Sequence, residues 1–363
     1  MKVLQVINSL NFGGAEKLLV ESIPIYIKHG VNVDILILNE DKTHFTKVLE
    51  NEHKVKIIKM GAAKNIYNPL NVFKIRKYLK NYDVIHVHLF PAIYWVALAS
   101  IFLRKKIKLI ATEHNTENRR RNILIFKYLD RFIYSKFSII GAISEGVKTN
   151  LSQHLGNKFK NIIQINNGIN LKTIKKAQPY NKSEFGLSQD DIIIVQVSSF
   201  TPQKDQETLI KATNSLPKNI HLFLVGDGPL KNNAIEIANS LEMNKRVHFL
   251  GHRSDVPRLL KTASISVLSS HYEGFGLVIV EGMAAGNACL GSDVPGLAEI
   301  IGNDGLLFSP GDHEELNKLL LELTSNLEFY NKISEKCFIR SEAFDIKIMV
   351  QKYLDLYYKQ KCA

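Results

Sequence analysis

The feature that most constrains the fold is a strand, a glycine-containing loop and a helix within residues 265–285. An apolar run at 265–268 is typical of a buried strand, and the apolar segment 277–285 is typical of a helix packed on a sheet. Between them, Gly274 and Gly276 lack a Cβ, so a ligand can approach the backbone there. Free N–H groups and the positive dipole end of such a helix favour a bound phosphate. The segment therefore predicts an α/β sheet with an anion site at this helix.

Two glutamates flank the start of this helix. Glu273 lies in the loop and Glu281 lies one to two turns into the helix, with seven residues between them. A diphosphate bound between these carboxylates would carry a polyol at each end, and each carboxylate could accept hydrogen bonds from hydroxyl groups. A nucleotide-diphosphate sugar has this shape, with a ribose at one end and a hexose at the other. The alternative is an ordinary loop followed by a solvated helix face.

Three motifs around this helix resemble those of one enzyme family: EGFG at 273–276, G-x-A at 286–288 and SDVPGLAEI at 292–300. Together with the Glu-x7-Glu spacing they resemble the retaining GT-B-fold glycosyltransferases of family 4, also called group 1 glycosyltransferases. The resemblance extends over nearly the whole chain. It implies an α/β fold of two Rossmann-like, doubly wound domains that face each other across a cleft. It also implies metal-independent transfer of a hexose with retention of the anomeric configuration.

The length and the order of motifs predict two domains. With 363 residues the chain can build two cores of ordinary size. We expect an N-terminal, acceptor-side domain at 1–172 and a C-terminal, nucleotide-sugar-binding domain at 187–344. The polar segment 172–186, which contains Pro179, is expected to be the linker. The resemblance implies that a last helix, within 345–363, packs back on the first domain.

A glycine pair opens the first domain. Residues 2–7 read as a strand and 15–27 as a helix, and the loop between them contains Gly13 and Gly14. The loop lacks GxGxxG spacing and the Lys-Ser/Thr of a P-loop, which argues against a dinucleotide oxidoreductase and a nucleoside triphosphatase. The resemblance implies that both glycines lie beside the donor phosphates and the acceptor. They also suit a tight turn, and the two interpretations are compatible.

Histidines and arginines follow the central strands of this domain. His86 and His88 share one face of a strand at 83–88, because strand side chains alternate. A metal could bind there, but no third ligand has suitable spacing, so we expect none. The resemblance implies a histidine near the donor sugar, for which His114, after a strand at 107–112, is preferred over His88. The further strands are expected at 33–38, 139–144 and 162–170.

Three arginines, Arg119, Arg120 and Arg121, follow the strand at 107–112. They could bind a phosphate of the acceptor. They would equally suit a solvated start of a helix. Further on, Asn170 replaces the usual aspartate of the family's Asn-Gly-hydrophobic-Asp signature.

The second domain shows one departure from the family pattern. After a strand at 191–198, the loop SSFTPQKDQ resembles the family's Gly-Arg-x4-Lys loop, with Lys204 at the lysine position. Ser199 stands where the arginine is usual, so one of the two cations for the donor phosphates is missing. The resemblance also places Arg253, after a strand at 247–250, near the nucleobase.

The resemblance implies a role for each residue of the donor site. Glu281 would bind the ribose and Glu273 the sugar hydroxyls. Lys204 would stabilise the departing phosphate together with the N–H groups of the loop at Gly274, Phe275, Gly276 and Leu277. We therefore expect a retaining hexosyltransferase of cell-surface polysaccharide synthesis that uses a nucleotide-diphosphate sugar, with UDP as the expected nucleotide, as co-substrate and has no cofactor. The alternative is a catalytically silent GT-B partner that binds the nucleotide sugar, which Ser199 would favour.

The excess of positive charge lies in the first half of the chain. The chain has a net charge of +12, and residues 1–172 carry 27 Lys and Arg against 12 Asp and Glu. This predicts an anionic partner, either a lipid-diphosphate or glycan acceptor or an anionic membrane surface, while solubility alone would also explain it. No aromatic-interleaved basic motif indicates nucleic acid.

Cysteine usage and hydropathy predict the cellular compartment of the protein. The three cysteines have no CxxC or metal-ligand spacing, which suits a reducing cytosol. The N-terminus has no signal-peptide pattern. The longest apolar stretch, 89–103, contains Pro91 and is too short for a bilayer span. We expect a cytoplasmic protein that can associate peripherally with the inner membrane face.

Overall fold

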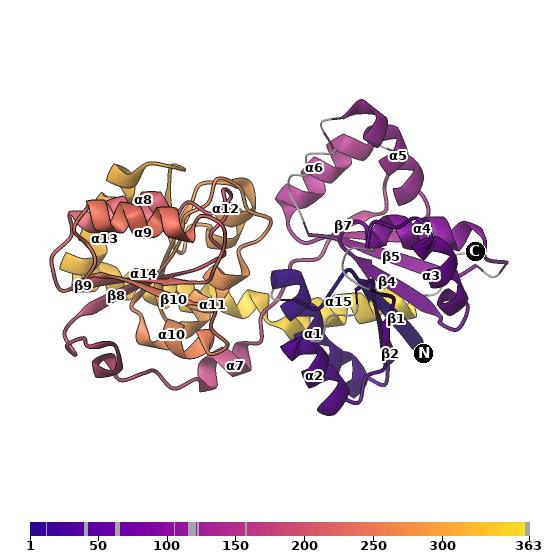
Figure 1. The fold of residues 1–363 in the computed structure, drawn as a ribbon, viewed down its shortest axis with the longest axis horizontal. Coiled ribbons are helices and arrows are strands. Elements are labelled where there is room, and N and C mark those ends of the chain that lie inside the picture. The colour runs from indigo at the N-terminus through magenta and orange to yellow at the C-terminus, as the bar shows by residue number, and fades with distance from the viewer. Residues whose placement is uncertain are drawn as a thin grey trace. The chain divides into compact units, whose positions relative to one another are not determined.

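The computed structural model describes residues 1–11, 13–39, 43–61, 66–104, 106–114, 121, 123–156 and 158–359. The chain folds into two compact units (Figure 1). Unit 1 comprises Met1–Gly168 and the segment from Ile346 onward, and unit 2 comprises Ile169–Asp345. Each unit is built on one parallel sheet covered by helices, because most strands are apolar on both faces and must be buried on both.

The sheet of unit 1 has the strand order β3-β2-β1-β4-β5-β6-β7. All neighbouring strands run parallel; in the register, Val3 of β1 lies opposite Val33 on one side and Val84 on the other. The strands are β1 (Lys2–Ile7), β2 (Asn32–Ile37), β3 (Ile57–Lys59), β4 (Val84–His88), β5 (Lys108–Glu113), β6 (Ile139–Ala142) and β7 (Ile162–Gln164).

Helices join these strands and cover both faces of the sheet. Side-chain caps fix two of the helix starts: Thr43 accepts from the N–H of Thr46 in a capping box, and Ser144 accepts from the N–H of Val147. The helices are α1 (Gly14–Lys28), α2 (His44–Asn51), α3 (Asn71–Leu79), α4 (Ala92–Ile101), α5 (Leu124–Tyr134), α6 (Glu145–Leu155) and α15 (Ile346–Tyr358).

The last helix, α15, belongs to unit 1. Met349, Val350 and Tyr353 are buried in the same core cluster as Val3 and Ile7 of β1. Apolar residues recur at helical spacing along α15, which gives it one buried face. α15 therefore packs in the core of unit 1.

Unit 2 repeats the doubly wound pattern with the strand order β10-β9-β8-β11-β12-β13. Its strands are β8 (Ile192–Val197), β9 (Ile220–Val225), β10 (Val247–Gly251), β11 (Ile265–Leu268), β12 (Ala288–Ser292) and β13 (Leu306–Phe308). Its helices are α7 (Leu171–Lys176), α8 (Gln206–Asn214), α9 (Lys231–Ser240), α10 (Val256–Thr262), α11 (Leu277–Ala285), α12 (Pro295–Ile301), α13 (His313–Ser325) and α14 (Leu327–Ser341), with 3₁₀ turns at Lys182–Phe185 and Glu342–Phe344.

The segment expected to be a linker is folded into unit 2. Leu171 and Ile174 of α7 are buried, and Asn170 accepts a hydrogen bond from the N–H of Thr173 as the N-cap. An asparagine caps a helix as well as an aspartate does, which explains how Asn170 can replace the usual residue. The strand expected at 162–170 is also shorter, because β7 ends at Gln164. Alternation of apolar and polar residues did not distinguish this short amphipathic helix from a polar linker.

Each sheet has one point where the direction of strand addition reverses. In unit 1 the reversal lies between β1 and β4, and in unit 2 it lies between β8 and β11. Ligands of open α/β sheets bind outside the carboxyl ends of the strands at such points. The loops that follow these four strands are therefore the first places to look for a site. Among the described residues, none of the helices has the length and apolarity needed to cross a membrane.

Candidate functional site

In unit 2, two loops are joined at the carboxyl ends of β8 and β11. The N–H of Asp205 donates to the carbonyl oxygen of Ser269 at 3.1 Å, and the N–H of His271 donates to that of Gln203 at 2.9 Å. Lys204 and Ser270 form an antiparallel bridge between these contacts. The loop after β8 is thus held by its backbone against the loop after β11.

An ion pair joins the side chains of the same two loops. Nζ of Lys204 contacts Oε2 of Glu273, and the two side chains are 13% and 12% exposed. The N–H of Gly274 donates to Oε1 of Glu273 at 3.1 Å, which fixes the second carboxylate oxygen. Because the pair lies mostly out of water, the ammonium and the carboxylate interact more strongly than at an exposed surface. The structure therefore brings together the two residues predicted to bind the sugar and the leaving phosphate.

The helix α11 begins directly after this ion pair. Gly276 is its N-cap, with φ of +82° and ψ of +50°, a left-handed conformation that favours glycine. Phe275 is 2% exposed, and its ring packs edge-on against Phe344 with centroids 5.7 Å apart. The side chain of Phe275 is thus a core anchor, so only its backbone is available to a ligand. The first turn of α11 provides N–H groups that have no partner within the helix.

Glu281 lies on the same helix and is 6% exposed. A carboxylate is rarely buried to this extent unless it is paired. The next residue, Gly282, brings α11 close to β11, because a Cβ there would lie 2.5 Å from Oγ of Ser266. The position of α11, and of Glu281 with it, therefore depends on a glycine at this contact.

The other predicted donor contacts lie on the neighbouring loops of unit 2. Ser199 is exposed after β8, with its hydroxyl 3.5 Å from that of Thr201. Arg253, after β10, donates to both carboxylate oxygens of Asp255 at 2.7 and 2.6 Å. These hydrogen bonds to Asp255 raise the pKa of Arg253, and they lower the pKa of Asp255. Arg253 is thus held by an internal ion pair, and its contact with a nucleobase stays a prediction.

Sequence reasoning missed one polar residue that holds the two loops together. Oε1 of Gln196 accepts from the hydroxyl of Ser269 at 2.8 Å, and Gln196 is 1% exposed. The signal was available, since Gln196 is a lone polar residue in the apolar strand IIIVQV. Gln5 holds a similar place in the first strand of unit 1, KVLQVI. A single glutamine inside a buried strand indicates a hydrogen-bonding role there.

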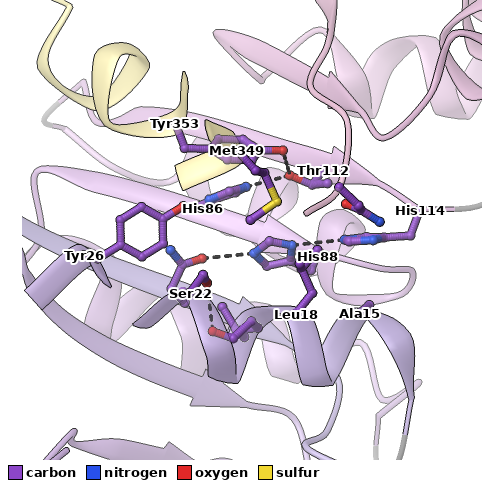
Figure 2. A pocket seen from close by; sticks show the side chains of 13 residues that line it. Ala15, Leu18, Ser22, Tyr26, His86, His88, Thr112, His114, Met349 and Tyr353 are labelled. Atoms are coloured by element: carbon purple, nitrogen blue, oxygen red, sulfur yellow. Dashed lines mark hydrogen bonds between the residues drawn. The ribbon is translucent and has the colours of Figure 1, made fainter. Parts of the chain in front are cut away.

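In unit 1, a small pocket lies between β1, β4, β5, α1 and α15 (Figure 2). Both of the competing histidines, His88 and His114, contribute to its wall, together with His86. The structure therefore places His88 and His114 side by side rather than at separate sites. Nδ1 of His88 lies 3.2 Å from Nε2 of His114.

The hydrogen bonds around Gln5 determine the tautomers of the His88 and His114 rings. Nε2 of Gln5 donates to Oη of Tyr357 at 3.0 Å, so Oε1 of Gln5 accepts from Nε2 of His88 at 3.0 Å. Burial lowers the pKa of His88 well below its ordinary value, so the ring is neutral and its Nδ1 is an acceptor. His114 must then donate from Nε2, which leaves its Nδ1 unprotonated. Burial lowers the pKa of His114 to about 4, so it too is neutral at pH 7.

His86 links the sheet to α15. Its Nδ1 lies 2.6 Å from Oη of Tyr357 and its Nε2 lies 2.7 Å from Oγ1 of Thr112, which also contacts Oη of Tyr353 at 2.7 Å. Burial, and to a lesser extent His114, lowers the pKa of His86 to about 3. Both ring nitrogens are therefore engaged in protein hydrogen bonds. Over the ranges that the structure describes, no group of three or more His, Cys, Asp or Glu could hold a metal ion.

The glycine pair after β1 lies at the start of α1. Gly13 is the N-cap and Gly14 the first helical residue. A Cβ on Gly13 would lie 2.3 Å from Oε2 of Glu16, so the carboxylate of Glu16 lies over the helix N-terminus. Burial raises the pKa of Glu16. The contact of Gly13 and Gly14 with donor phosphates stays a prediction.

The structure describes one of the three predicted acceptor arginines. Nη2 of Arg121 lies 3.2 Å from Oε2 of Glu113, its Nη1 donates to Oδ1 of Asn150 at 2.6 Å, and its side chain is 8% exposed. Arg121 is therefore paired and mostly buried rather than a solvated start of a helix, and its contact with an acceptor phosphate stays a prediction. Arg119 and Arg120 lie outside the described residues.

Comparison with known proteins identifies the family. The model of the Glycosyl transferases group 1 matches residues 178–338, and that of Glycosyltransferase Family 4 matches residues 12–173. An uncharacterized glycosyltransferase of Methanocaldococcus jannaschii is 30% identical over 303 residues, which span 79% of this chain and 80% of that protein. The chain belongs to the group 1, family 4 glycosyltransferases. The predicted family membership is thereby confirmed.

Two other relatives of this glycosyltransferase have more specific names. N-acetyl-alpha-D-glucosaminyl L-malate synthase of Bacillus anthracis is 28% identical over 292 residues, covering 77% of this chain and 75% of that protein. UDP-Gal:alpha-D-GlcNAc-diphosphoundecaprenol alpha-1,3-galactosyltransferase of Escherichia coli is 26% identical over 323 residues, which cover 82% of this chain and 80% of that protein. Both names describe glycosyl transfer, so the coarse prediction of a glycosyltransferase is confirmed.

A solved structure confirms the fold. Anabaena HepE, crystallised in complex with UDP and glucose, superposes with a TM-score of 0.87 at 22% identity and covers 99% of this chain and 100% of that one. The predicted GT-B fold, with two Rossmann-like units, is therefore correct.

Proposed function

We propose that this glycosyltransferase transfers a hexose from a UDP-sugar to a hydroxyl of a glycan or lipid-linked acceptor, with retention of the anomeric configuration and without a metal. One observation carries the proposal. The ion pair of Lys204 and Glu273 lies at the start of α11, at the point of unit 2 where the strand order reverses. A cation, a carboxylate and a helix N-terminus thus meet where the doubly wound fold binds nucleotides.

Each part of this arrangement has a distinct role in our proposal. The diphosphate of the donor binds the N–H groups from Gly274 to Leu277, which include those of Phe275 and Gly276. Glu281 accepts hydrogen bonds from the ribose hydroxyls, and Glu273 accepts them from the hydroxyls of the sugar. The buried position of both carboxylates supports these roles, since a desolvated acceptor binds hydroxyl groups strongly.

The chemical step breaks the bond between the anomeric carbon and the phosphate oxygen and forms a bond from that carbon to the acceptor oxygen. The acceptor's proton passes to the departing phosphate on the same face of the sugar. Negative charge grows on the phosphate as it leaves, and Lys204 with the N–H groups of α11 stabilises that charge. His114 is our candidate for a further contact in transfer, because its unprotonated Nδ1 can accept a hydrogen bond from a hydroxyl.

Names of similar proteins support the donor and the acceptor class. HepE was crystallised with UDP and glucose, and the E. coli relative is named for UDP-Gal and a diphosphoundecaprenol-linked acceptor. Residues 1–172 contain 27 Lys and Arg but only 12 Asp and Glu. This excess of positive charge suits a lipid-diphosphate acceptor. We therefore place the protein in cell-surface glycan synthesis, in the cytoplasm and peripherally on the inner face of the membrane.

Ser199 supports a second candidate, a GT-B protein that binds the nucleotide sugar but does not transfer it. The exposed Ser199 cannot supply the positive charge that an arginine would give the diphosphate. The two candidates differ in one measurement. An active transferase releases UDP slowly from its correct UDP-sugar even without acceptor, whereas a silent partner only binds it.

The experiment compares Glu273→Ala and Glu281→Ala with the wild-type chain. A panel of nucleotide sugars is screened first by thermal shift to find the donor, and release of the nucleoside diphosphate is then measured. Both variants should lose at least about a hundredfold in turnover. The matched control is Glu236→Ala on α9, an exposed glutamate of the same unit, which should keep wild-type turnover. Full turnover in both site variants would refute the assignment.

A further inference from the structure

The helix α5 turns its apolar side to solvent. Five of its large apolar side chains are 40–72% exposed, and they recur at helical spacing along one side of the helix. We call them the α5 stripe: Leu124, Ile125, Tyr128, Leu129 and Phe132. Monomeric proteins seldom expose so many contiguous large apolar side chains on one helix unless they bind something there.

Buried hydrogen bonds enforce this orientation. Asp130 is 1% exposed, and its carboxylate accepts from Oη of Tyr94 on α4 and lies 2.8 Å from Nε2 of His154 on α6. Nε of Arg131 donates to the carbonyl oxygen of Leu155 at 2.7 Å. In Figure 1, α5 lies beside α6, in agreement with these contacts. Turning the apolar side inward would move Asp130 away from the buried Tyr94 and His154 and leave their polar groups without this partner, which would be costly. The outward stripe is therefore built into the fold.

The charged side chains beside the stripe are basic. Within residues 123–137 the only acidic residue is the buried Asp130, and the remaining charges are Lys127, Arg131 and Lys136. Nζ of Lys136 lies 4.3 Å from the ring centre of Phe132, and the guanidinium of Arg131 lies 6.0 Å from that of Tyr128. Cations thus lie over two of the exposed aromatic rings.

We propose that the α5 stripe docks on the surface of an anionic lipid bilayer. Its apolar side chains would enter the boundary between headgroups and acyl chains, while Lys127, Arg131 and Lys136 would contact lipid phosphates. With 11 residues, α5 is too short to span a bilayer, so it lies in the plane of the surface. The charges favour lipid over a second copy of the chain, because face-to-face pairing would bring like charges together.

This inference deepens the proposed membrane partner by naming the surface that contacts it. It rests on the proposed peripheral location and does not depend on the transfer reaction. Vesicle binding tests the membrane inference, and turnover with a soluble acceptor tests the transfer reaction. Either measurement can therefore give a negative result without affecting the other. Docking would hold unit 1, whose basic residues are proposed to meet the acceptor, at the surface that contains a lipid-linked acceptor.

The test measures co-sedimentation of the full chain with vesicles of phosphatidylcholine alone or mixed with phosphatidylglycerol. We expect the wild-type chain to bind the mixed vesicles and to bind phosphatidylcholine vesicles far less. The double variant Ile125→Ser, Tyr128→Ser should lower the partition coefficient by at least about tenfold, because two large side chains no longer enter the boundary. Lys127→Gln should lower it by about fivefold on the mixed vesicles only.

The matched control is the double variant Phe73→Ser, Phe102→Ser. These exposed aromatic residues of the same unit lie together, with ring centres 6.2 Å apart, and Arg76 lies 6.0 Å from the ring of Phe102. The control should bind the mixed vesicles like the wild type, and all variants should keep the wild-type circular dichroism and melting temperature.

Three outcomes would overturn the proposal. The first is no binding of the wild-type chain to the mixed vesicles. The second is equal binding by the wild type and the α5 double variant, which would assign any membrane contact to another basic surface. The third is a wild-type dimer by light scattering that the α5 substitutions convert to a monomer, which would show that a second copy covers the stripe.

Discussion

The ammonium group of Lys204 is paired with the carboxylate of Glu273, although the two residues are 69 positions apart in the chain. The backbone of the two loops holds them at this contact, so the pair is fixed before any donor binds. An anionic diphosphate would give Lys204 a second negative partner. A cation that is already in position needs little reorganisation when charge develops on a leaving group.

Lys204→Met should therefore lower kcat by about 10²–10³, the usual loss when one positioned donor of a charged transition state is removed. Steady-state turnover of the donor tests this. The matched control is Lys211→Met on α8, because Lys211 forms an exposed pair with Glu207 at 2.7 Å in the same unit. An equal effect of the two substitutions would show that Lys204 acts only through general charge.

Ser199→Arg should tighten binding of the nucleoside diphosphate by about tenfold, because a charge-assisted hydrogen bond to the diphosphate is gained. Ser199 is exposed, so an arginine can be accommodated without displacing the core. Isothermal titration with UDP measures the change. Unchanged affinity would mean that Ser199 does not occupy the place of the family's arginine.

Some of the fold could be predicted from local sequence. The strand expected at 2–7 coincides with β1, and the apolar run before Ser269 coincides with β11, because buried parallel strands are short, continuous apolar runs. The strand, loop and helix within 265–285 also predicted an α/β sheet, whereas the doubly wound domains were implied by the resemblance to the family. These features depend on neighbouring residues, so a single sequence contains them.

Contacts between distant residues could not be predicted in this way. Gln5 and Tyr357 are hydrogen-bonded across 352 positions, and His86 and Tyr357 across 271. Nothing in the local pattern indicates that α15 supplies a hydroxyl to these strands. For the same reason His88 and His114 were treated as competitors, whereas they form one hydrogen-bonded pair. The pairing of Arg121 with Glu113 was missed as well.

The neutral histidines of unit 1 should make its stability depend on pH. Burial lowers the pKa of His86 to about 3, from an ordinary value of 6.5. Below pH 6.5 the unfolded chain therefore binds a proton that the folded chain does not, so stability is full above pH 6.5 and falls as the pH decreases. The loss approaches about 1.4 kcal/mol per pH unit for one such histidine.

His86→Gln should reduce this dependence. Melting temperatures between pH 7 and pH 4.5 should fall less steeply in the variant than in the wild type, even if the variant is less stable at pH 7. The control is His29→Gln, since His29 is exposed at the end of α1. Parallel curves for wild type and His86→Gln would contradict the burial of a neutral His86.

Gly276 and Gly286 lie at the two ends of α11. Substituting each of them separates the effect of backbone strain on stability from the effect of displacing the start of the helix. Gly276 and Gly286 both have left-handed φ values, +82° and +91°, so alanine at either should cost about 1–2 kcal/mol of unfolding free energy. Their surroundings differ. A Cβ on Gly276 would lie 2.8 Å from Cδ1 of the buried Leu297, whereas a Cβ on Gly286 meets nothing within 4 Å.

Gly276→Ala should therefore also displace the first turn of α11 and lower kcat by at least about tenfold, because a small misplacement of groups that bind the transition state is costly. Gly286→Ala should lose similar stability and keep kcat within about twofold of the wild type. Chemical denaturation and steady-state turnover on both variants provide the comparison. If both variants lost activity in proportion to stability, the N-terminus of α11 would be a structural element with no part in binding the donor phosphates.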